Sequence, residues 1–216
     1  MATGQDFVTQ LRRDTEPLMS RITEHAFVQE TIAGRLPRET LVRFAEQEHH
    51  YVRGIYDYFA MCVLQAPDLD MKEWFIEVAQ REVGYLGLYR RFLQALGVGA
   101  EALLASKPLP GALAATNYQF RLAGCGTPGE NMAAVLMIEE SWAEVCRRIH
   151  QGLQTHYGLS PEAAAGFDIP PLDVQKEEAF IARLATTAEA CRLMQTAADF
   201  ALIYEAMFFD SVYAGR

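Results

Sequence analysis

The stretch Met137-Ile138-Glu139-Glu140-Ser141-Trp142 lies in the middle of a long helical pattern that begins at Pro128. Seven positions along this pattern, spaced alternately three and four residues apart, share one side of a helix, and six of them suit a protein core. Glu139 does not, because burying an unpaired carboxylate is very costly unless its pKa shifts. The seven positions are Met132, Val135, Glu139, Trp142, Cys146, Ile149 and Leu153.

Composition limits the class of protein. The chain has 216 residues, of which half are apolar, enough for a large core. Its 28 acidic and 19 basic residues give a net charge of −9, which argues against a nucleic-acid partner. The four cysteines form no C-x-x-C pair, so neither a zinc site nor a disulfide framework is indicated. Without a leader pattern or an apolar run of 18 residues, we expect a cytoplasmic protein that does not cross a membrane.

The same 3.6-residue periodicity recurs along the chain, and few alternating stretches typical of β-strands occur. The sequence therefore predicts an all-α fold of about seven helices around one core, in a single domain spanning residues 1–216. Long helices are expected at residues 5–24, 37–66, 70–97, 111–123 and from 128 onward, with a last helical region at about 173–213.

Three further long helices carry a glutamate within an otherwise apolar stripe, as Glu139 does. These are Glu48, Glu82 and Glu205. A single case is usually a residue at the edge of the stripe whose carboxylate reaches water. If the four stripes converge, however, the four carboxylates form an acidic pocket inside the bundle.

Aromatic residues on these stripes, together with Tyr118 from the helix expected at residues 111–123, would line that pocket. Such walls with a few polar groups suit a flat, cationic or amidine-like heteroaromatic ligand. The expected wall residues are Tyr51, Tyr85, Tyr89, Tyr118, Trp142 and Phe208.

A metal site is the alternative use of such acids. Di-iron bundles usually add Glu-x-x-His motifs, but tyrosine, tryptophan or phenylalanine follows each of the four glutamates at that spacing. We therefore expect no redox metal and no cofactor, while a carboxylate-only Mg²⁺ or Mn²⁺ site stays open. Cys62, Cys146 and Cys191 lie on apolar stripes and are expected to be structural thiols.

Several motifs resemble those of the TenA (thiaminase II) family, within the TenA/THI-4/PqqC group of haem-oxygenase-like helical proteins. The motifs are His25-x-Phe27-Val28, Gly34-x-Leu36-Pro37, Phe44-x-x-Gln47-Glu48-x-x-Tyr51 and Tyr204-Glu205-x-x-Phe208-Phe209-Asp210-x-x-Tyr213. The resemblance implies a pocket for an aminopyrimidine and a homo-oligomer, either a dimer or a tetramer.

The resemblance also assigns roles to residues. The family's Gln-Asp-x-x-Tyr carboxylate falls on Glu48, and its C-terminal pyrimidine-binding glutamate falls on Glu205. The family's nucleophilic cysteine falls on Ile138. A cysteine-less branch instead has Ile-Glu-x-x-Tyr, which resembles Ile138-Glu139 with Trp142 in place of tyrosine. That branch is associated with hydrolysis of amino- or formylamino-pyrimidines.

The chain departs from the family in two places. A pyrimidine-packing aromatic falls on Ala115, where Tyr118 could substitute. The His-x-x-x-Asp-x-x-His motif of the PqqC and di-iron relatives falls on residues 169–176, where only the aspartate is retained, as Asp173. Their Glu-x₆-His motif falls on Glu82 to Tyr89, so a tyrosine replaces the histidine.

We therefore expect a hydrolase in which Glu139 is the acid–base residue, with Glu48 and Glu205 holding the ring. The alternatives are a PqqC or di-iron type oxidoreductase and a non-catalytic ligand-binding or regulatory protein.

Overall fold

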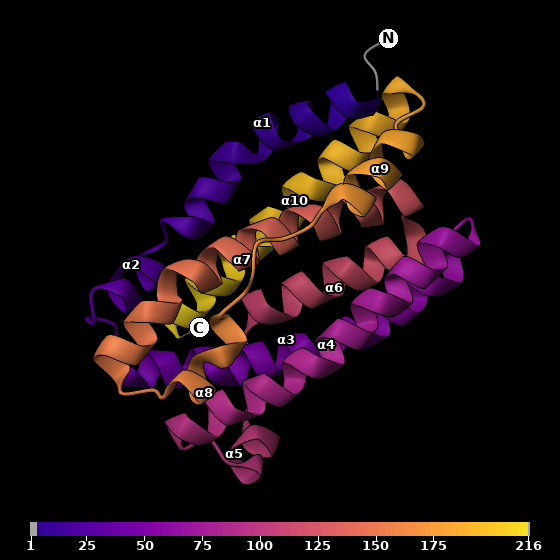
Figure 1. Ribbon diagram of the computed structural model, residues 1–216. Coiled ribbons are helices and arrows are strands. Elements are labelled where there is room, and N and C mark those ends of the chain that lie inside the picture. Colours follow the sequence, from indigo (N-terminus) through magenta and orange to yellow (C-terminus); the bar gives the residue numbers. More distant parts are fainter. Residues whose placement is uncertain (1–3, 216) are drawn as a thin grey trace.

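The computed structural model describes residues 4–215, and within that range every regular element is a helix (Figure 1). The helices are α1 (Gly4–Thr23), α2 (Ala26–Ile32), α3 (Arg38–Gln65), α4 (Leu69–Leu96), α5 (Ala100–Ala105), α6 (Pro110–Cys125), α7 (Pro128–Tyr157), α8 (Pro161–Ala164), the 3₁₀ helix η1 (Ala165–Phe167), α9 (Gln175–Leu184) and α10 (Ala188–Ala214). The all-α prediction is confirmed. Residues 1–3 and 216 of the predicted domain lie outside the described residues.

Local sequence signals fix the ends of the central helix α7. The Thr127 side chain accepts a hydrogen bond from the Glu130 amide, and the Glu130 carboxylate accepts one from the Thr127 amide. This reciprocal capping, with Pro128 at the first helical position, satisfies amides that the helix itself cannot. The helix ends at Gly158, whose φ of 66° is a left-handed conformation that glycine adopts without steric cost.

Five long helices enclose the interior. Helix α3 packs on α4 and α6, while α10 packs on α6 and α7, and Figure 1 shows α1 and α9 alongside α10 and α7. Gly111 allows α6 and α10 to approach closely, because a Cβ there would lie 2.3 Å from the carbonyl oxygen of Met207. The arrangement turns one face of each long helix towards a common centre.

Aromatic side chains fill that centre. Phe44 is fully buried, and its ring lies 4.8 Å from that of Phe27 and 6.3 Å from that of Trp142, centroid to centroid. Phe208 and Phe209 pack on it from α10, at 6.1 and 6.4 Å. Rings from four separate helices therefore meet at Phe44, and their burial fixes how α3, α7 and α10 sit together.

The structure refines the predicted helix count. The described residues form ten α-helices instead of about seven, since α2, α5 and α8 are separate short helices. The predicted last helical region, residues 173–213, is two helices. The break falls at 185–187, where the Thr187 side chain caps α10 by accepting a hydrogen bond from the Ala190 amide.

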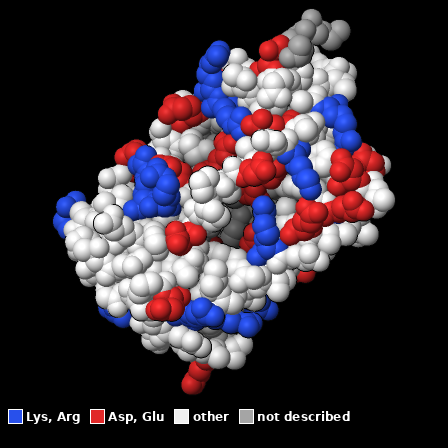
Figure 2. Space-filling model, in the orientation of Figure 1, with Lys and Arg blue, Asp and Glu red and all other residues white. Residues whose placement is uncertain are grey.

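The surface carries charges of both signs. Figure 2 shows acidic and basic side chains interspersed on one face of the molecule. Within residues 4–215, no helix is both long and apolar enough to span a membrane.

Candidate active site

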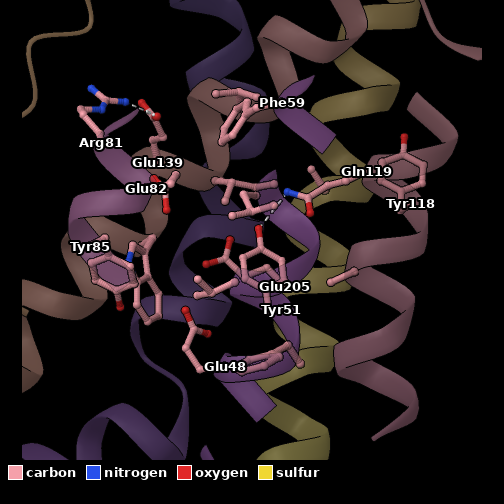
Figure 3. A pocket seen from close by; sticks show the side chains of 18 of the residues that line it. Glu48, Tyr51, Phe59, Arg81, Glu82, Tyr85, Tyr118, Gln119, Glu139 and Glu205 are labelled. Carbon is pink, nitrogen blue, oxygen red and sulfur yellow. Dashed lines mark hydrogen bonds and ion pairs between the residues drawn. The ribbon is translucent and has the colours of Figure 1, made fainter. Parts of the chain in front are cut away.

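A cavity of about 200 Å³ lies between α3, α4, α6, α7 and α10. Each of these helices contributes side chains from its inward face, so the four glutamate stripes do converge (Figure 3). Nine of the ten predicted site residues line the cavity. They are Glu48, Tyr51, Glu82, Tyr85, Tyr118, Glu139, Trp142, Glu205 and Phe208.

Tyr89 is the exception among the predicted residues. It is buried on α4 below Tyr85, with ring centroids 5.9 Å apart, and it does not belong to the lining. Its hydroxyl donates a hydrogen bond to the backbone oxygen of Ala45 on α3. Tyr89 follows Tyr85 by one helical turn, and at that level α4 faces helix α3 and not the cavity.

Glu48 and Glu205 form the inner part of the site. Burial raises the pKa of Glu48 to about 8, and the nearby charges of Glu205 and Glu82 add to the effect. Burial likewise raises the pKa of Glu205 to about 8, against a hydrogen bond that the Ser141 hydroxyl donates to its carboxylate. Both carboxyl groups therefore hold a proton at neutral pH, because a charged form is poorly solvated there.

Tyr51 lies between these acids and α6. Gln119 Nε2 donates a 2.8 Å hydrogen bond to the Tyr51 hydroxyl, and Figure 3 shows this hydroxyl beside Glu205. Burial, with the charges of Glu205 and Glu48, raises the pKa of Tyr51 well above its usual range. The Tyr51 side chain therefore stays neutral, and it lines the cavity with a hydroxyl that can form hydrogen bonds.

The outer part of the site contains an ion pair. Arg81 Nη2 lies 2.7 Å from Glu139 Oε1, and the side chains are 56% and 18% exposed respectively. Burial raises the pKa of Glu139 to about 7, and Arg81 opposes this rise. The pKa of Glu82 is also raised by burial and lowered by Arg81. Glu139 differs from Glu48 and Glu205 in having a cationic partner.

Three polar residues of the site were missed by the sequence reasoning. Arg81 and Gln119 line the cavity, and the Ser141 hydroxyl donates a hydrogen bond to the carboxylate of Glu205. Ser141 lies two residues after Glu139, and no periodicity distinguishes it. Gln119 offered a signal, since it is a polar residue one position beyond Tyr118 in a segment expected to be helical.

The polar groups of the described cavity lining are four carboxylates, three tyrosine hydroxyls, the Gln119 amide, the Arg81 guanidinium and the Trp142 indole, with no histidine among them. Within residues 4–215, no group of three or more His, Cys, Asp or Glu side chains is placed to hold a metal ion. Cys146 is buried, and burial with the charges of Glu48 and Glu205 raises the pKa of its thiol well above the usual range. Cys62 is buried as well, whereas Cys191 is half-buried.

The arrangement suits one kind of chemistry. Two protonated carboxyl groups can each donate and accept a hydrogen bond at the edge of a flat ring. Tyr51, Tyr85, Trp142 and Phe208 offer aromatic walls for such a ring. Glu139, with a pKa of about 7, can take and return a proton at neutral pH.

Two relatives of known activity are similar to this chain. The aminopyrimidine aminohydrolase of Halalkalibacterium halodurans is 28% identical over 140 residues, which are 64% of this chain and 62% of that protein. The 4-aminobenzoate synthase of Chlamydia trachomatis is 26% identical over 149 residues, which are 67% of this chain and 64% of that protein. The chain thus spans less than two thirds of the length of either relative.

Solved structures share the architecture. A TenA homolog from Pseudomonas syringae pv. tomato superimposes with a TM-score of 0.84 at 14% identity, covering 95% of this chain and 92% of that one. A domain of unknown function with a heme oxygenase-like fold, from Shewanella denitrificans, gives 0.82 at 17% identity, covering 96% and 92%. These likenesses show that the fold is haem-oxygenase-like. Because residues 12–214 match the model of the TENA/THI-4/PQQC family, the chain belongs to that family.

Proposed function

We propose that this protein is a hydrolase that removes an amino or formyl group from an aminopyrimidine, with Glu139 as the acid–base residue. The observation that carries the proposal is the meeting of Glu48, Glu82, Glu139 and Glu205, from four helices, in one aromatic-walled cavity. The similarity to an aminopyrimidine aminohydrolase supports the substrate class.

The inner acids would hold the ring. An aminopyrimidine presents a ring nitrogen beside an exocyclic amine, which is one acceptor beside one donor. A protonated carboxyl group matches that edge with two hydrogen bonds, and transfer of its proton to the ring leaves the same pair charge-assisted. Glu48 and Glu205 are the two groups whose pKa of about 8 keeps them protonated at neutral pH.

Glu139 would move the proton of the attacking water. In its ionised form it accepts a proton from water as the oxygen bonds to the carbon that bears the leaving nitrogen. At an aminomethyl carbon the carbon–nitrogen bond breaks as the carbon–oxygen bond forms, and Glu139 returns the proton to the leaving nitrogen. A formylamino substrate gives formate and an amine by the same transfer, through attack at the formyl carbon.

The residue before Glu139 bears on the type of chemistry. Ile138 lines the cavity at the position where the family's cysteine branch has its nucleophile. An isoleucine there offers no nucleophile, so the proposed reaction proceeds by direct attack of water. We infer on this basis that the chain belongs to the cysteine-less, glutamate-type branch.

A product assay tests the proposal. The purified protein is incubated with an aminomethyl-aminopyrimidine and, separately, with its formylamino derivative, and the products are separated by liquid chromatography. We expect release of ammonia and the hydroxymethyl product in the first case, or of formate in the second. Failure to turn over either compound, in the presence of demonstrated binding, would favour a non-catalytic binding protein.

An oxidoreductase is the second candidate, because the similarity to a 4-aminobenzoate synthase favours it. The residues do not fit a di-iron centre, since the cavity lining has glutamates and no histidine. Metal analysis of the purified protein separates the two candidates. A content of two irons per chain would contradict the hydrolase proposal and favour the oxidoreductase.

The predicted cytoplasmic location and homo-oligomeric state stay predictions. Light scattering on the purified protein measures the oligomeric state directly.

A further inference from the structure

We propose that Arg81 is a positioning residue that makes Glu139, and not Glu48 or Glu205, the base of the site. The inference rests on the proposed function. Arg81 is the one Lys or Arg among the described residues that line the cavity. It lies on α4 and reaches across to α7, where its Nη2 is 2.7 Å from Glu139 Oε1 (Figure 3).

The ion pair fixes one oxygen of Glu139. Within residues 4–215, Glu139 Oε2 has no hydrogen-bond partner, so it is available to a water or a ligand. A single contact to Arg81 also restricts the rotation of the carboxylate about its last side-chain bond. The carboxylate is thereby held with one oxygen engaged and the other free, as a base that must face a water molecule requires.

Other charges near Glu139 act against its ionisation. Glu82 faces it from α4 and Glu177 from α9, and both carboxylates repel a second negative charge. Glu177 is only 2% exposed, with its Oε2 buried and without a hydrogen-bond partner. Among the charged groups that act on Glu139, Arg81 alone favours the ionised form.

The inner acids lack such a partner. The charged groups acting on Glu48 are Glu205 and Glu82, which favour its neutral form. Glu205 accepts a hydrogen bond from the hydroxyl of Ser141, which is a neutral donor. The one cation of the described lining therefore favours the ionised forms of Glu139 and its neighbour Glu82, while no cation acts in this way on Glu48 or Glu205. This division matches what the proposed reaction needs from each.

The test uses three variants of the full-length protein. Arg81→Gln removes the cation and Arg81→Lys retains it. Arg90→Gln, on the exposed side of the same helix and outside the lining, is the matched control. Because Arg81 is mostly exposed, we expect the thermal unfolding midpoints of all three to stay near that of the wild type.

Two readouts are measured. The first is the titration of the Glu139 carboxyl by carbon-13 NMR of glutamate-labelled protein, assigned with Glu139→Gln. The second is kcat for aminopyrimidine hydrolysis as a function of pH. In Arg81→Gln we expect the Glu139 midpoint and the acidic limb of the kcat profile to move to higher pH together, by roughly one unit. Arg81→Lys should lie between that variant and the wild type, and Arg90→Gln should match the wild type.

The outcomes separate this inference from the proposed function. A Glu139 titration that is unchanged in Arg81→Gln overturns the inference, whether or not the protein is active. A moved titration in a protein that hydrolyses no aminopyrimidine overturns the proposed function and leaves the effect of Arg81 on Glu139 standing. A moved titration with an unmoved acidic limb shows that Glu139 is not the base, which overturns the inference as well.

Discussion

The side-chain amide of Gln119 donates a 2.8 Å hydrogen bond to the hydroxyl of Tyr51, joining α6 to α3 within the cavity wall. Gln119 is 3% exposed, and its Oε1 has no partner among the described residues. The bond holds the Tyr51 ring beside Glu205. A substitution that removes this hydrogen bond would change the shape of the cavity wall without altering the glutamates themselves.

Replacing Gln119 with leucine should weaken ligand binding. The Tyr51 hydroxyl loses the donor that orients it towards the ligand, and weakening that one contact in the complex costs about 1–2 kcal/mol of binding free energy, so KM should rise roughly tenfold while kcat changes less. Steady-state kinetics on the aminopyrimidine substrate measure both constants. Asn117→Ala, an exposed change on the same helix, is the control and should leave KM unchanged. A KM at the wild-type value would show that the Tyr51 contact is not used in binding.

The pH dependence of hydrolysis should be bell-shaped. Glu139 must be ionised to accept a proton, so kcat/KM should rise as pH increases through about 7. Glu48 and Glu205 must be protonated to pair with the neutral ring, so kcat/KM should fall as pH increases beyond about 8. A profile measured in buffers of constant ionic strength checks this. Activity that keeps rising to high pH would contradict the role given to the inner acids.

Glu48 should also make folding stability depend on pH. Its pKa is raised from 4.5 to about 8, so the folded chain retains a proton that the unfolded chain releases. Its favourable contribution is complete below the unfolded value of 4.5 and is lost as pH rises to about 8. At about 1.4 kcal/mol per unit, the loss is on the order of 3–5 kcal/mol.

Glu48→Gln removes this dependence, because the amide does not titrate. Urea unfolding is measured for both proteins at about pH 5 and about pH 8.5. Between those conditions, the free energy of unfolding of the wild type should fall by several kcal/mol more than that of the variant. Equal losses would mean that Glu48 is not buried as the structure places it.

Replacing Cys146 with alanine should leave hydrolysis within about threefold of the wild type, because the thiol is buried and neutral and water is the proposed nucleophile. The lost sulfur should lower stability by about 1 kcal/mol through the small cavity it leaves. Kinetics and urea unfolding measure the two effects. A loss of activity of a hundredfold in a folded variant would indicate thiol chemistry.

Periodicity predicted the fold well, since a core stripe leaves a regular trace in the sequence. The helix starts expected near Pro128 and residue 70 are confirmed, and the side chains of Thr127 and Asp68 cap those helices. The break at 185–187 was not predicted. Ala185, Thr186 and Thr187 include neither Gly nor Pro, and the local signal was Thr187, whose side chain caps α10, while α9 packs against α1 and α7.

The acids of the site were predictable because each is misplaced on an apolar stripe. Tyr89 shows the limit of that reasoning, since a stripe is longer than the cavity it passes and part of it packs against a neighbouring helix. Arg81 lies off the stripe of α4 and is mostly exposed, so periodicity treats it as a surface residue. Its importance comes from a contact between residues 58 positions apart, which no local pattern contains. The expectation that residues 1–216 form a single domain stays a prediction.

The role of Glu139 is the central claim, and the Glu139→Gln variant tests it most directly. Glutamine keeps the size and one oxygen of the side chain but cannot accept a proton from water. With Glu140→Gln as the neighbouring control, whose native side chain pairs with Arg12 outside the cavity, binding is measured by calorimetry and hydrolysis by product release. The account predicts that Glu139→Gln binds the aminopyrimidine as the wild type does while kcat falls by about 10²–10⁴. Near-normal kcat in a variant that binds normally would contradict it.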